Sequence, residues 1–332
     1  MTTIEDVARM AGVSTATVSR VLNGTAIVSA KTEKKVRNAI KTCHYHANML
    51  GSGLRSRSTK TVLCIVSTIS NSFYAKVIKG IEDEAEANGY RVLVGTNYDS
   101  EEREDSYLTL VRNRLADGVI LMRPSISDAA LGDLAASFPV VQCDCPSRLA
   151  SIPFVSIDNR KAAREMTERL IASGHRKIAL LRVPDGYAVA EERFKGYRDA
   201  LEGAGIPFSD ELVLEGNYGY RNAKEVVSAF LETERPDAIF AFSDRMAAGA
   251  MAAAREKGLS VPEDISLAGF DNIDLSYMMD PPLTTVSQNQ YRMGVMAMQK
   301  LLSLMRDNKS EESTYIDYEI KWRASVADRT NK

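Results

Sequence analysis

Strand-like and helix-like segments alternate along most of this 332-residue chain. Apolar stretches of strand length occur at residues 62–68, 90–96, 118–122, 140–144, 155–158, 177–181, 238–243 and 265–271. Stretches with helical periodicity lie between them, at residues 73–88, 101–115, 160–173, 191–203, 221–232 and 245–257. Repeated strand–helix units favour parallel, doubly wound sheets with helices on both faces. Because the chain is too long for one ordinary domain, we predict an α/β body with two such lobes.

The first 46 residues show a different pattern, that of three short helices. The apolar residues at helical spacing in the first are Ile4, Val7, Ala8 and Ala11. Gly12 suits the left-handed conformation that ends a helix, and Ser14 suits the cap of the next one. The inward face of that second helix is predicted to carry Val18, Val21 and Leu22. A third helix is expected at about residues 31–44. Two helices joined by a short turn form a helix-turn-helix, whose second helix fits the major groove of DNA.

Charge separates the same two regions. Residues 1–60 hold ten Lys or Arg and three Asp or Glu, whereas the remainder holds 32 and 41, for an overall charge of −2. A basic segment on an acidic body is typical of a head that binds a polyanion. Charge alone leaves a solvated basic tail as the alternative, but the helical pattern favours the DNA-binding head.

Longer runs of residues carry a specific resemblance. In the head they are Asp6-Val7-Ala8, Ala11-Gly12-Val13-Ser14 and Thr17-Val18-Ser19-Arg20-Val21-Leu22-Asn23. In the body they include Asn71-Ser72-Phe73-Tyr74, Ala116-Asp117-Gly118, Ser243-Asp244 and Gly269-Phe270-Asp271-Asn272. The chain thereby resembles the lactose-repressor (LacI/GalR) family of bacterial transcription regulators over nearly its whole length.

The resemblance implies a domain organisation. It places a helix-turn-helix DNA-binding domain at residues 1–46, a hinge at 47–60, and an effector-binding and dimerisation domain of the periplasmic-binding-protein type at 61–332. We expect an N-terminal lobe at about 61–157 and 288–318, and a C-terminal lobe at about 158–287 and 319–332. The chain would cross between the lobes near residues 156–159, 285–288 and 318–324.

The resemblance also assigns the DNA contacts. Thr15, Ala16 and Arg20 occupy positions where the family reads bases. An arginine can bond both acceptors of guanine, although Arg20 could instead contact a phosphate. The residues expected to position the head on DNA are Ser14, Thr17, Ser19 and Asn23.

In the hinge, Leu54 aligns with the family's minor-groove wedge, and the alternative is an exposed residue on a simple tether. Ala47 replaces a usual proline and Gly51 a usual alanine. With Gly53, two glycines disfavour a short helix. We therefore expect the hinge to become ordered only on DNA.

Polar and aromatic residues follow the predicted strands, where ligands of open α/β sheets bind. The expected effector residues, which the resemblance also places at the ligand, are Asn71, Phe73, Tyr74, Asp144, Arg193, Tyr218, Ser243, Asp244, Asp271 and Gln290. Such a set suits a sugar or glycoside, with a nucleoside or purine second. Phe73 could instead be core, Asp271 a turn residue, and Asp144 structural between two cysteines.

The sequence offers no positive case for an enzyme, cofactor or metal. There is no phosphate-binding loop and no triad. The histidines His44, His46 and His175 lack partners at ligand spacing, and His175 is read as structural. No apolar run approaches the roughly 20 residues of a membrane span, and no secretory signal pattern is seen. Four cysteines make no disulfide framework, so we expect a cytoplasmic protein.

Three function classes are therefore weighed. A transporter's solute-binding protein would need a signal peptide and no DNA-binding head, and a sugar kinase or isomerase would need a phosphate loop or acid–base pair. The favoured prediction is a repressor that binds a pseudo-palindromic operator and is switched by an effector. Apolar residues in 291–305 and 73–88 further predict a homodimer through the N-terminal lobe.

Overall fold

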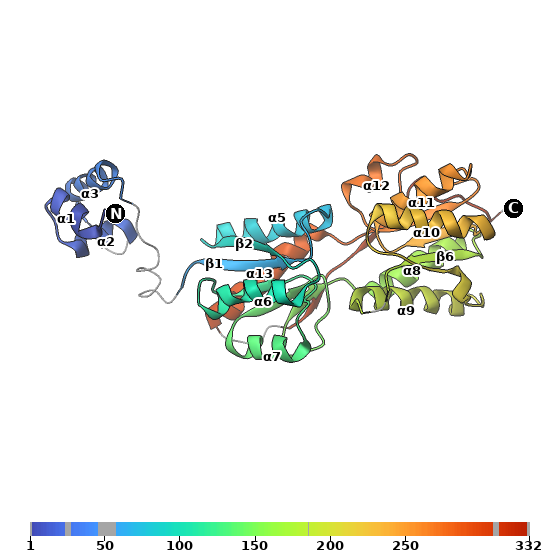
Figure 1. Ribbon diagram of the computed structural model, residues 1–332, viewed down its shortest axis with the longest axis horizontal. Helices are drawn as coiled ribbons and strands as arrows, with labels where there is room; N and C mark the ends of the chain where they lie inside the picture. Colours follow the sequence, from blue (N-terminus) through green and yellow to red (C-terminus); the bar gives the residue numbers. More distant parts are fainter. Residues whose placement is uncertain (1, 24–27, 46–57, 185, 308–311, 331–332) are drawn as a thin grey trace. The chain divides into compact units, whose positions relative to one another are not determined.

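The structure, a computed structural model, describes residues 2–23, 28–45, 58–184, 186–307 and 312–330 (Figure 1). The chain falls into two compact units, residues 1–59 and residues 60–332.

The first unit is a three-helix domain. Its helices are α1 (Ile4–Ala11), α2 (Thr15–Asn23) and α3 (Ala30–Thr42). Thr3 and Asp6 form a capping box at the start of α1, and Ser29 caps α3. The fully buried residues are Val7, Val18 and Val36. The predicted three-helix head is confirmed, with one correction. Leu22 is 37% exposed, because the buried stripe of α2 runs through Val18 and Val21 and Leu22 falls at its edge.

The second unit contains two six-stranded sheets. The first, with its helices, is called the N-lobe. Its strand order is β11-β5-β4-β3-β1-β2, and all its pairs are parallel. The strands are β1 (Thr61–Val66), β2 (Arg91–Thr96), β3 (Val119–Leu121), β4 (Val140–Cys143), β5 (Phe154–Ser156) and β11 (Thr314–Tyr315). The helices are α5 (Ser72–Ala87), α6 (Glu101–Arg112), α7 (Asp128–Ser137) and α13 (Gln290–Asp307).

The second sheet and its helices form the C-lobe. Its order is β12-β10-β9-β8-β6-β7, and only β12 is antiparallel to its neighbour. The strands are β6 (Ile178–Arg182), β7 (Val213–Glu215), β8 (Ala238–Ala241), β9 (Ser266–Asp271), β10 (Thr284–Ser287) and β12 (Glu319–Lys321). The helices are α8 (Asn159–Ala172), α9 (Ala188–Gly203), α10 (Tyr220–Thr233), α11 (Asp244–Glu256) and α12 (Asp274–Met278), with a 3-10 turn at Asp210–Leu212.

The chain crosses between the lobes three times. The crossings lie between β5 and α8, between β10 and α13, and between β11 and β12. The first two fall where the sequence predicted them. The third starts earlier than the predicted residues 318–324, because β12 already begins at Glu319.

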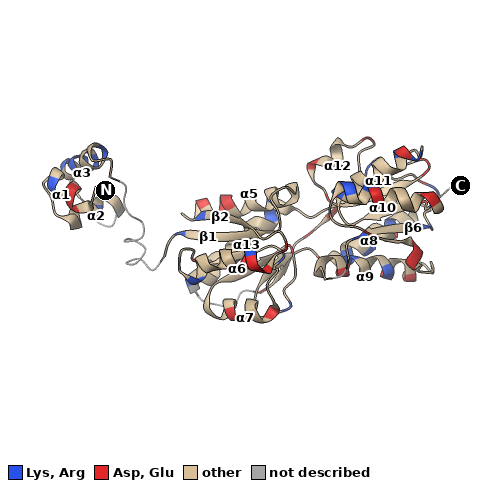
Figure 2. Ribbon diagram, in the orientation of Figure 1, with Lys and Arg blue, Asp and Glu red and all other residues tan. Residues whose placement is uncertain are grey.

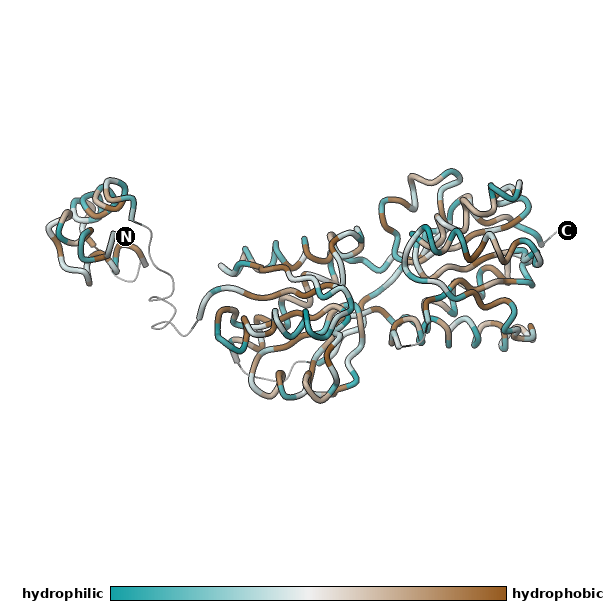
Figure 3. The backbone as a smooth tube through the Cα atoms, in the orientation of Figure 1, coloured by the Kyte–Doolittle hydropathy of each residue, from teal (hydrophilic) through white to brown (hydrophobic). Residues whose placement is uncertain are grey.

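Alternate residues of each strand face opposite layers of helices. Along β1, Val62 and Cys64 belong to the core with α5 and α13, while Leu63 and Ile65 pack with α6 and α7. Figure 3 shows hydrophobic runs along the central strands of both lobes, as expected of parallel strands covered on both faces. The predicted doubly wound architecture is confirmed.

Helices α5 and α13 cross in direct backbone contact. A Cβ atom added at Gly294 would lie 2.0 Å from the Val77 carbonyl oxygen, and one at Gly80 would lie 2.1 Å from that of Tyr291. Val77 and Met293 are fully buried at this crossing. The sequence predicted a homodimer from the apolar residues of these two helices. Because most of those residues pack inside one chain, they are not the surface of a dimer contact, and the reason for that prediction is corrected.

Candidate functional site

Helix α2 presents a mostly polar face to solvent. Gly12, with φ of 66°, ends α1, and the Ser14 hydroxyl accepts the Thr17 N–H at 3.2 Å and lies 3.0 Å from the Thr17 hydroxyl. Of the expected DNA contacts, Ser14, Thr15, Ala16 and Arg20 are exposed, and Thr17 and Ser19 are half-buried. Figure 2 shows further basic residues along α3 of the same unit.

Two of the expected DNA contacts cannot be placed. The side chain of Asn23 and the whole of Leu54 lie outside the described residues, as does most of the predicted hinge.

In the second unit, the expected effector residues lie where strands of both lobes end. Asn71 starts α5 after β1, and Asp144 follows β4 in the N-lobe. Asp271 ends β9 in the C-lobe, and Arg193 projects from α9. The charges of Arg193 and Asp271 both act on Asp144, so these groups from the two lobes form one electrostatic cluster.

Arg193 is the fixed centre of this cluster. It is buried, its Nε donates to Asn159 Oδ1 at 2.8 Å, and its Nη1 donates to the Phe242 carbonyl at 2.7 Å. The guanidinium carbon lies 3.6 Å from the centroid of the Phe270 ring, and Nη2 is 4.0 Å from Asp271 Oδ1. A guanidinium has five N–H donors, so Arg193 keeps donors for a ligand while its orientation is set.

Asp271 is held in an unusual backbone conformation, with φ of 107°. Gln288 Nε2 donates to its Oδ1 at 2.7 Å, and the Gln290 amide donates to its backbone carbonyl. Burial raises the pKa of Asp271 to about 7, against the lowering influence of Arg193 and Gln288. Gln288 was not predicted as a site residue, although it lies at a lobe crossing beside the predicted Gln290.

Asp144 is the most unsatisfied acidic group of the cluster. Its φ is 70°, and its buried Oδ1 has no hydrogen-bond partner among the described residues. Burial raises the pKa of Asp144 to about 8; Asp271 raises it further, while Arg193 and Arg123 lower it. A buried acceptor without a partner is rare in folded proteins and suits a donor supplied by a ligand.

Aromatic rings surround these charges. The Tyr74 hydroxyl accepts a hydrogen bond from Ser67 Oγ at 2.9 Å, and burial raises its pKa. Tyr218 packs edge-to-face on Tyr187, with 6.1 Å between ring centroids. The Arg123 guanidinium lies 4.3 Å from the Tyr187 centroid and 5.8 Å from that of Tyr218.

Arg123 belongs to the N-lobe and both of these rings to the C-lobe, so this cation–π contact joins the lobes. Arg123 and Tyr187 were missed from the sequence. Arg123 follows β3 so closely that the strand-end rule would have found it.

Four predicted site residues serve the fold in this structure. Asp244 is fully buried, and its oxygens accept the Thr285 hydroxyl at 2.5 Å and the Ile273 N–H at 2.8 Å. Both oxygens thus accept hydrogen bonds within the C-lobe, which gives Asp244 a structural role there. The hydroxyl of Ser243 caps α11, the side chain of Asn71 caps α5, and Phe73 is 3% exposed in the core.

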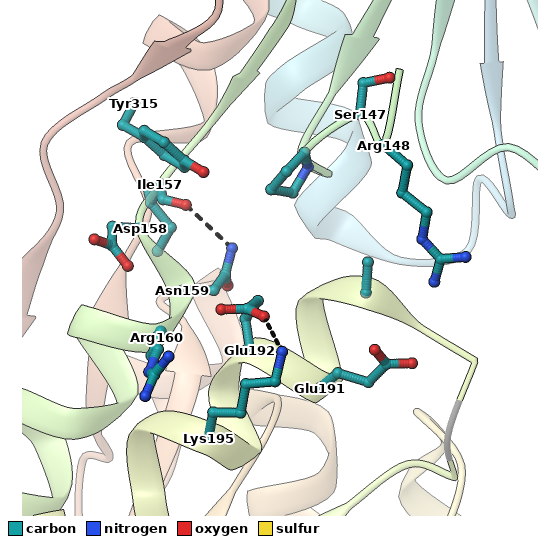
Figure 4. Close-up of a pocket in the computed structure, with 12 residues that line it drawn as sticks. Ser147, Arg148, Ile157, Asp158, Asn159, Arg160, Glu191, Glu192, Lys195 and Tyr315 are labelled. Carbon is teal, nitrogen blue, oxygen red and sulfur yellow. Dashed lines mark hydrogen bonds and ion pairs between the residues drawn. The ribbon is translucent and has the colours of Figure 1, made fainter. Parts of the chain in front are cut away.

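Two cavities open along the seam between the lobes. The larger, about 360 Å³, is drawn in Figure 4. Arg148 reaches into it from the N-lobe loop after β4, opposite Glu191 of α9, while Tyr315 and Asn159 form its other side (Figure 4). Because Asn159 also binds Arg193, this cavity adjoins the charged cluster. The smaller cavity is about 290 Å³ and is lined by Arg123 and Tyr187 among others.

His175 bonds the Leu170 carbonyl at 2.9 Å and the Ser266 hydroxyl at 2.8 Å, which fits its structural reading. Within the described residues, no three His, Cys, Asp or Glu side chains are grouped to hold a metal ion. None of the described helices is long and apolar enough to span a membrane.

Known proteins resemble this chain over its full length. The family described as "Periplasmic binding proteins and sugar binding domain of LacI family" matches residues 59–323, and "Bacterial regulatory proteins, lacI family" matches residues 3–48. Catabolite control protein A of Priestia megaterium is 38% identical over 331 residues, covering 98% of this chain and 99% of that protein.

Two solved structures share the fold. The Lac repressor dimer bound to operator and the anti-inducer ONPF has a TM-score of 0.88 at 27% identity, covering 98% of this chain and 99% of that one. The complex of the transcriptional regulator CelR with cellobiose has a TM-score of 0.73 at 31% identity, covering 98% and 100%. These matches identify a family of DNA-binding transcriptional regulators with an effector-binding domain, not of enzymes. The chain is a member of the LacI family of bacterial regulatory proteins.

Proposed function

We propose that this chain is a sequence-specific repressor whose affinity for operator DNA is switched by a small molecule held between its lobes. The observation that carries the proposal is the charged cluster of Arg193, Asp144 and Asp271, which draws on both lobes of the same chain that carries an exposed helix α2. A DNA-reading surface and an interlobe ligand site are the two parts that such a switch requires.

On this proposal, residues 1–46 bind DNA, 47–60 form the hinge, and the two lobes of 61–332 bind the effector. Arg20 reads a base pair, with Thr15 and Ala16 beside it. Leu54 wedges the minor groove. The protein acts in the cytoplasm, needs no cofactor for this function, and binds a pseudo-palindromic operator.

The repressor acts as a homodimer. The edge strand β2 exposes Leu93 by 44% and Val94 by 40%, an apolar surface that an N-lobe contact would cover. The similar Lac repressor is a dimer on its operator.

The effector is a sugar or glycoside, with a nucleoside or purine as the second candidate. Asp144 and Asp271 offer acceptors, Arg193 offers donors, and Tyr74 and Tyr218 offer ring surfaces. Vicinal hydroxyls donate and accept at once, so they can satisfy this mixed set. The similar regulator CelR was solved with cellobiose, which supports the sugar.

The switch follows from the position of the ligand. A ligand that touches both lobes favours whichever interlobe arrangement it fits better, by the difference of its affinities for the two. A coupling of about 1–3 kcal/mol changes operator affinity roughly 5- to 150-fold.

The test has two stages. The full chain first selects its binding site from a pool of random DNA duplexes. Sugars, glycosides, nucleosides and purines are then screened for a rise in melting temperature, since a ligand of the native fold stabilises it. Operator titrations with and without each hit complete the test. We expect a palindromic site and a ligand-dependent shift in affinity. Failure to enrich any sequence, or a bound ligand that leaves operator affinity unchanged, contradicts the proposal.

A further inference from the structure

The smaller interlobe cavity has the chemistry of an anion site. It is called the α9 cavity here, and the lining residues used below are Arg123, Gln142, Arg148, Tyr187, Ala188 and Val189. Its volume of about 290 Å³ is enough for a phosphate or carboxylate together with adjoining atoms of a larger ligand.

The first feature is the start of α9, which opens into this cavity. Tyr187 occupies the N-cap position and makes no side-chain capping bond. Ala188 and Val189 line the cavity, and no described residue accepts a hydrogen bond from the backbone N–H of either. Helix α9 is 16 residues long, so its first turn combines unpaired donors with the positive end of a helix dipole.

The second feature is a pair of arginines from the N-lobe. Arg148 is exposed and has neither an ion pair nor a hydrogen bond within the described residues. Arg123 pairs with Asp99 and lies over the Tyr187 ring, which fixes its guanidinium at the cavity wall. Asp128 is the one carboxylate among the described lining residues, and it is exposed. Arg123 is already balanced by Asp99, whereas Arg148, which also lines the larger cavity opposite Glu191, makes no ion pair with any described residue.

The third feature is Gln142, a buried amide whose oxygen has no partner among the described residues. It is 4% exposed and lines the cavity, and its Nε2 lies 3.6 Å from Cys145 Sγ. No described residue donates to its Oε1. Leaving a buried acceptor unpaired costs about 1–3 kcal/mol, so a ligand hydroxyl at this position would be stabilising. The cavity therefore offers an acceptor for a hydroxyl next to donors for an anion.

We propose that the α9 cavity binds the anionic group, a phosphate or a carboxylate, of a hydroxylated ligand. Arg148 and the first N–H groups of α9 hold the anion, and Gln142 accepts a neighbouring hydroxyl. This inference rests on the proposed function and narrows it. The Arg123–Tyr187 contact links the cavity to Tyr218 of the charged cluster, so one ligand can place hydroxyls at Asp144 and Asp271 and its anion at Arg148. The effector class becomes an acidic sugar derivative.

Inorganic phosphate is the minimal probe. The melting temperature of the full chain is followed as phosphate replaces chloride at constant ionic strength. We expect a saturable rise for the wild-type chain. Arg148→Gln should weaken the apparent phosphate affinity at least tenfold, and Arg148→Lys should largely retain it because the charge remains.

Ala188→Pro tests the helix separately. Proline is tolerated at the first position of a helix and lacks the N–H, so this variant should fold and bind phosphate more weakly. The matched control is Arg103→Gln, which removes an exposed arginine of α6 that stacks on Tyr98 and does not line the cavity. Its phosphate affinity should equal that of the wild type. Any phosphate bound by the basic head would contribute equally to both proteins.

Two results overturn the inference. One is the absence of a phosphate effect on the wild-type chain. The other is an equal effect in the wild type and in Arg148→Gln, which would mark binding as adventitious.

Glucose, glucose 6-phosphate and glucuronate, compared in the same assay, distinguish a phosphate from a carboxylate as the bound anion. Operator titrations with these three ligands distinguish failure of the anion site from failure of the proposed switch. Suppose that a neutral sugar shifts operator affinity while the phosphate affinity is the same in the wild type and in Arg148→Gln. The anion site is then contradicted and the proposed function stands. Suppose instead that phosphate binding requires Arg148, but a ligand bound between the lobes leaves operator affinity unchanged. The proposed switch is then contradicted and the anion site stands.

Discussion

Replacing Asp144 by asparagine should make the body more stable, by an amount that depends on pH. Burial raises the pKa of this carboxyl from 3.8 to about 8, and its Oδ1 has no partner among the described residues. Near neutral pH the unfolded chain holds Asp144 ionised, whereas the folded chain must keep it protonated or bury an unsatisfied charge. Asparagine is neutral in both states and of nearly the same size, so it removes this cost.

The sign and the window follow from the two pKa values. Below about pH 4, Asp144 is protonated in both states, and the variant and the wild type should be almost equally stable. As the pH rises from about 4 to about 8, the unfolded chain binds fewer protons than the folded chain, so the wild type loses stability. Above about pH 8 the difference is constant. Because each pKa unit corresponds to about 1.4 kcal/mol, the rise from 3.8 to about 8 sets an upper bound of roughly 6 kcal/mol, and we expect a difference of a few kcal/mol.

The assay is thermal unfolding of wild type and Asp144→Asn at intervals from pH 4.5 to 8.5, without effector. A stabilisation of this size corresponds to a rise of several degrees, at about 2–4 °C per kcal/mol. Asp133→Asn is the control, because Asp133 is an exposed residue of α7. The control difference should not change with pH. A variant that is less stable than the wild type at pH 8, or whose advantage is the same at every pH, would refute the reasoning.

Three further predictions follow from the same structure. Arg20→Ala should weaken operator binding by about 1–3 kcal/mol and relax one base position per half-site, as read by selection from random DNA; an unchanged consensus contradicts base reading. Asp271→Asn should keep the fold and the ligand-free operator affinity but lose most of the effector-dependent shift in a DNA titration, because it alters a ligand acceptor and leaves Arg193 in place. Gly294→Ala should lower the melting temperature markedly, since its Cβ would lie 2.0 Å from the Val77 carbonyl oxygen, whereas Gly132→Ala meets only a methyl carbon at 3.6 Å and should be neutral or stabilising.

Arg193 illustrates how the structure changes the choice of experiment. The sequence places Arg193 among the expected effector residues, so Arg193→Ala would be the direct test of effector binding. The side chain proves to be buried, hydrogen-bonded to Asn159 and Phe242, and stacked on Phe270. Removing one member of a buried charged network costs about 3–5 kcal/mol, so that variant would lose stability along with any ligand contact. Asp271→Asn is the cleaner change because it preserves the shape of the site.

Local patterns in the sequence were sufficient to predict most elements and the division into head and body. Apolar runs of strand length, helical periodicity and caps such as Ser14 and Ser29 act over a few residues, so they can be read without knowing what lies across the fold. The strand-end rule selected Asp144 and Asp271, because each follows or ends a strand at the carboxyl edge of the sheet in its own lobe. The five-residue helix α12 lacked a pattern long enough to stand out.

What a side chain does at such an edge was decided only by tertiary packing. Asp144 and Asp244 both follow strands, yet Asp144 keeps an oxygen without a partner among the described residues, while the oxygens of Asp244 accept hydrogen bonds from Thr285 and Ile273. In the sequence, the apolar faces of α5 and α13 exceed what one core requires. In the structure, Gly80 and Gly294 allow the two helices to pack directly against each other. The α9 cavity depends on Arg148 of one lobe facing the start of a helix in the other. Such pairings join residues far apart in the chain, and local periodicity carries no information about which distant group will approach.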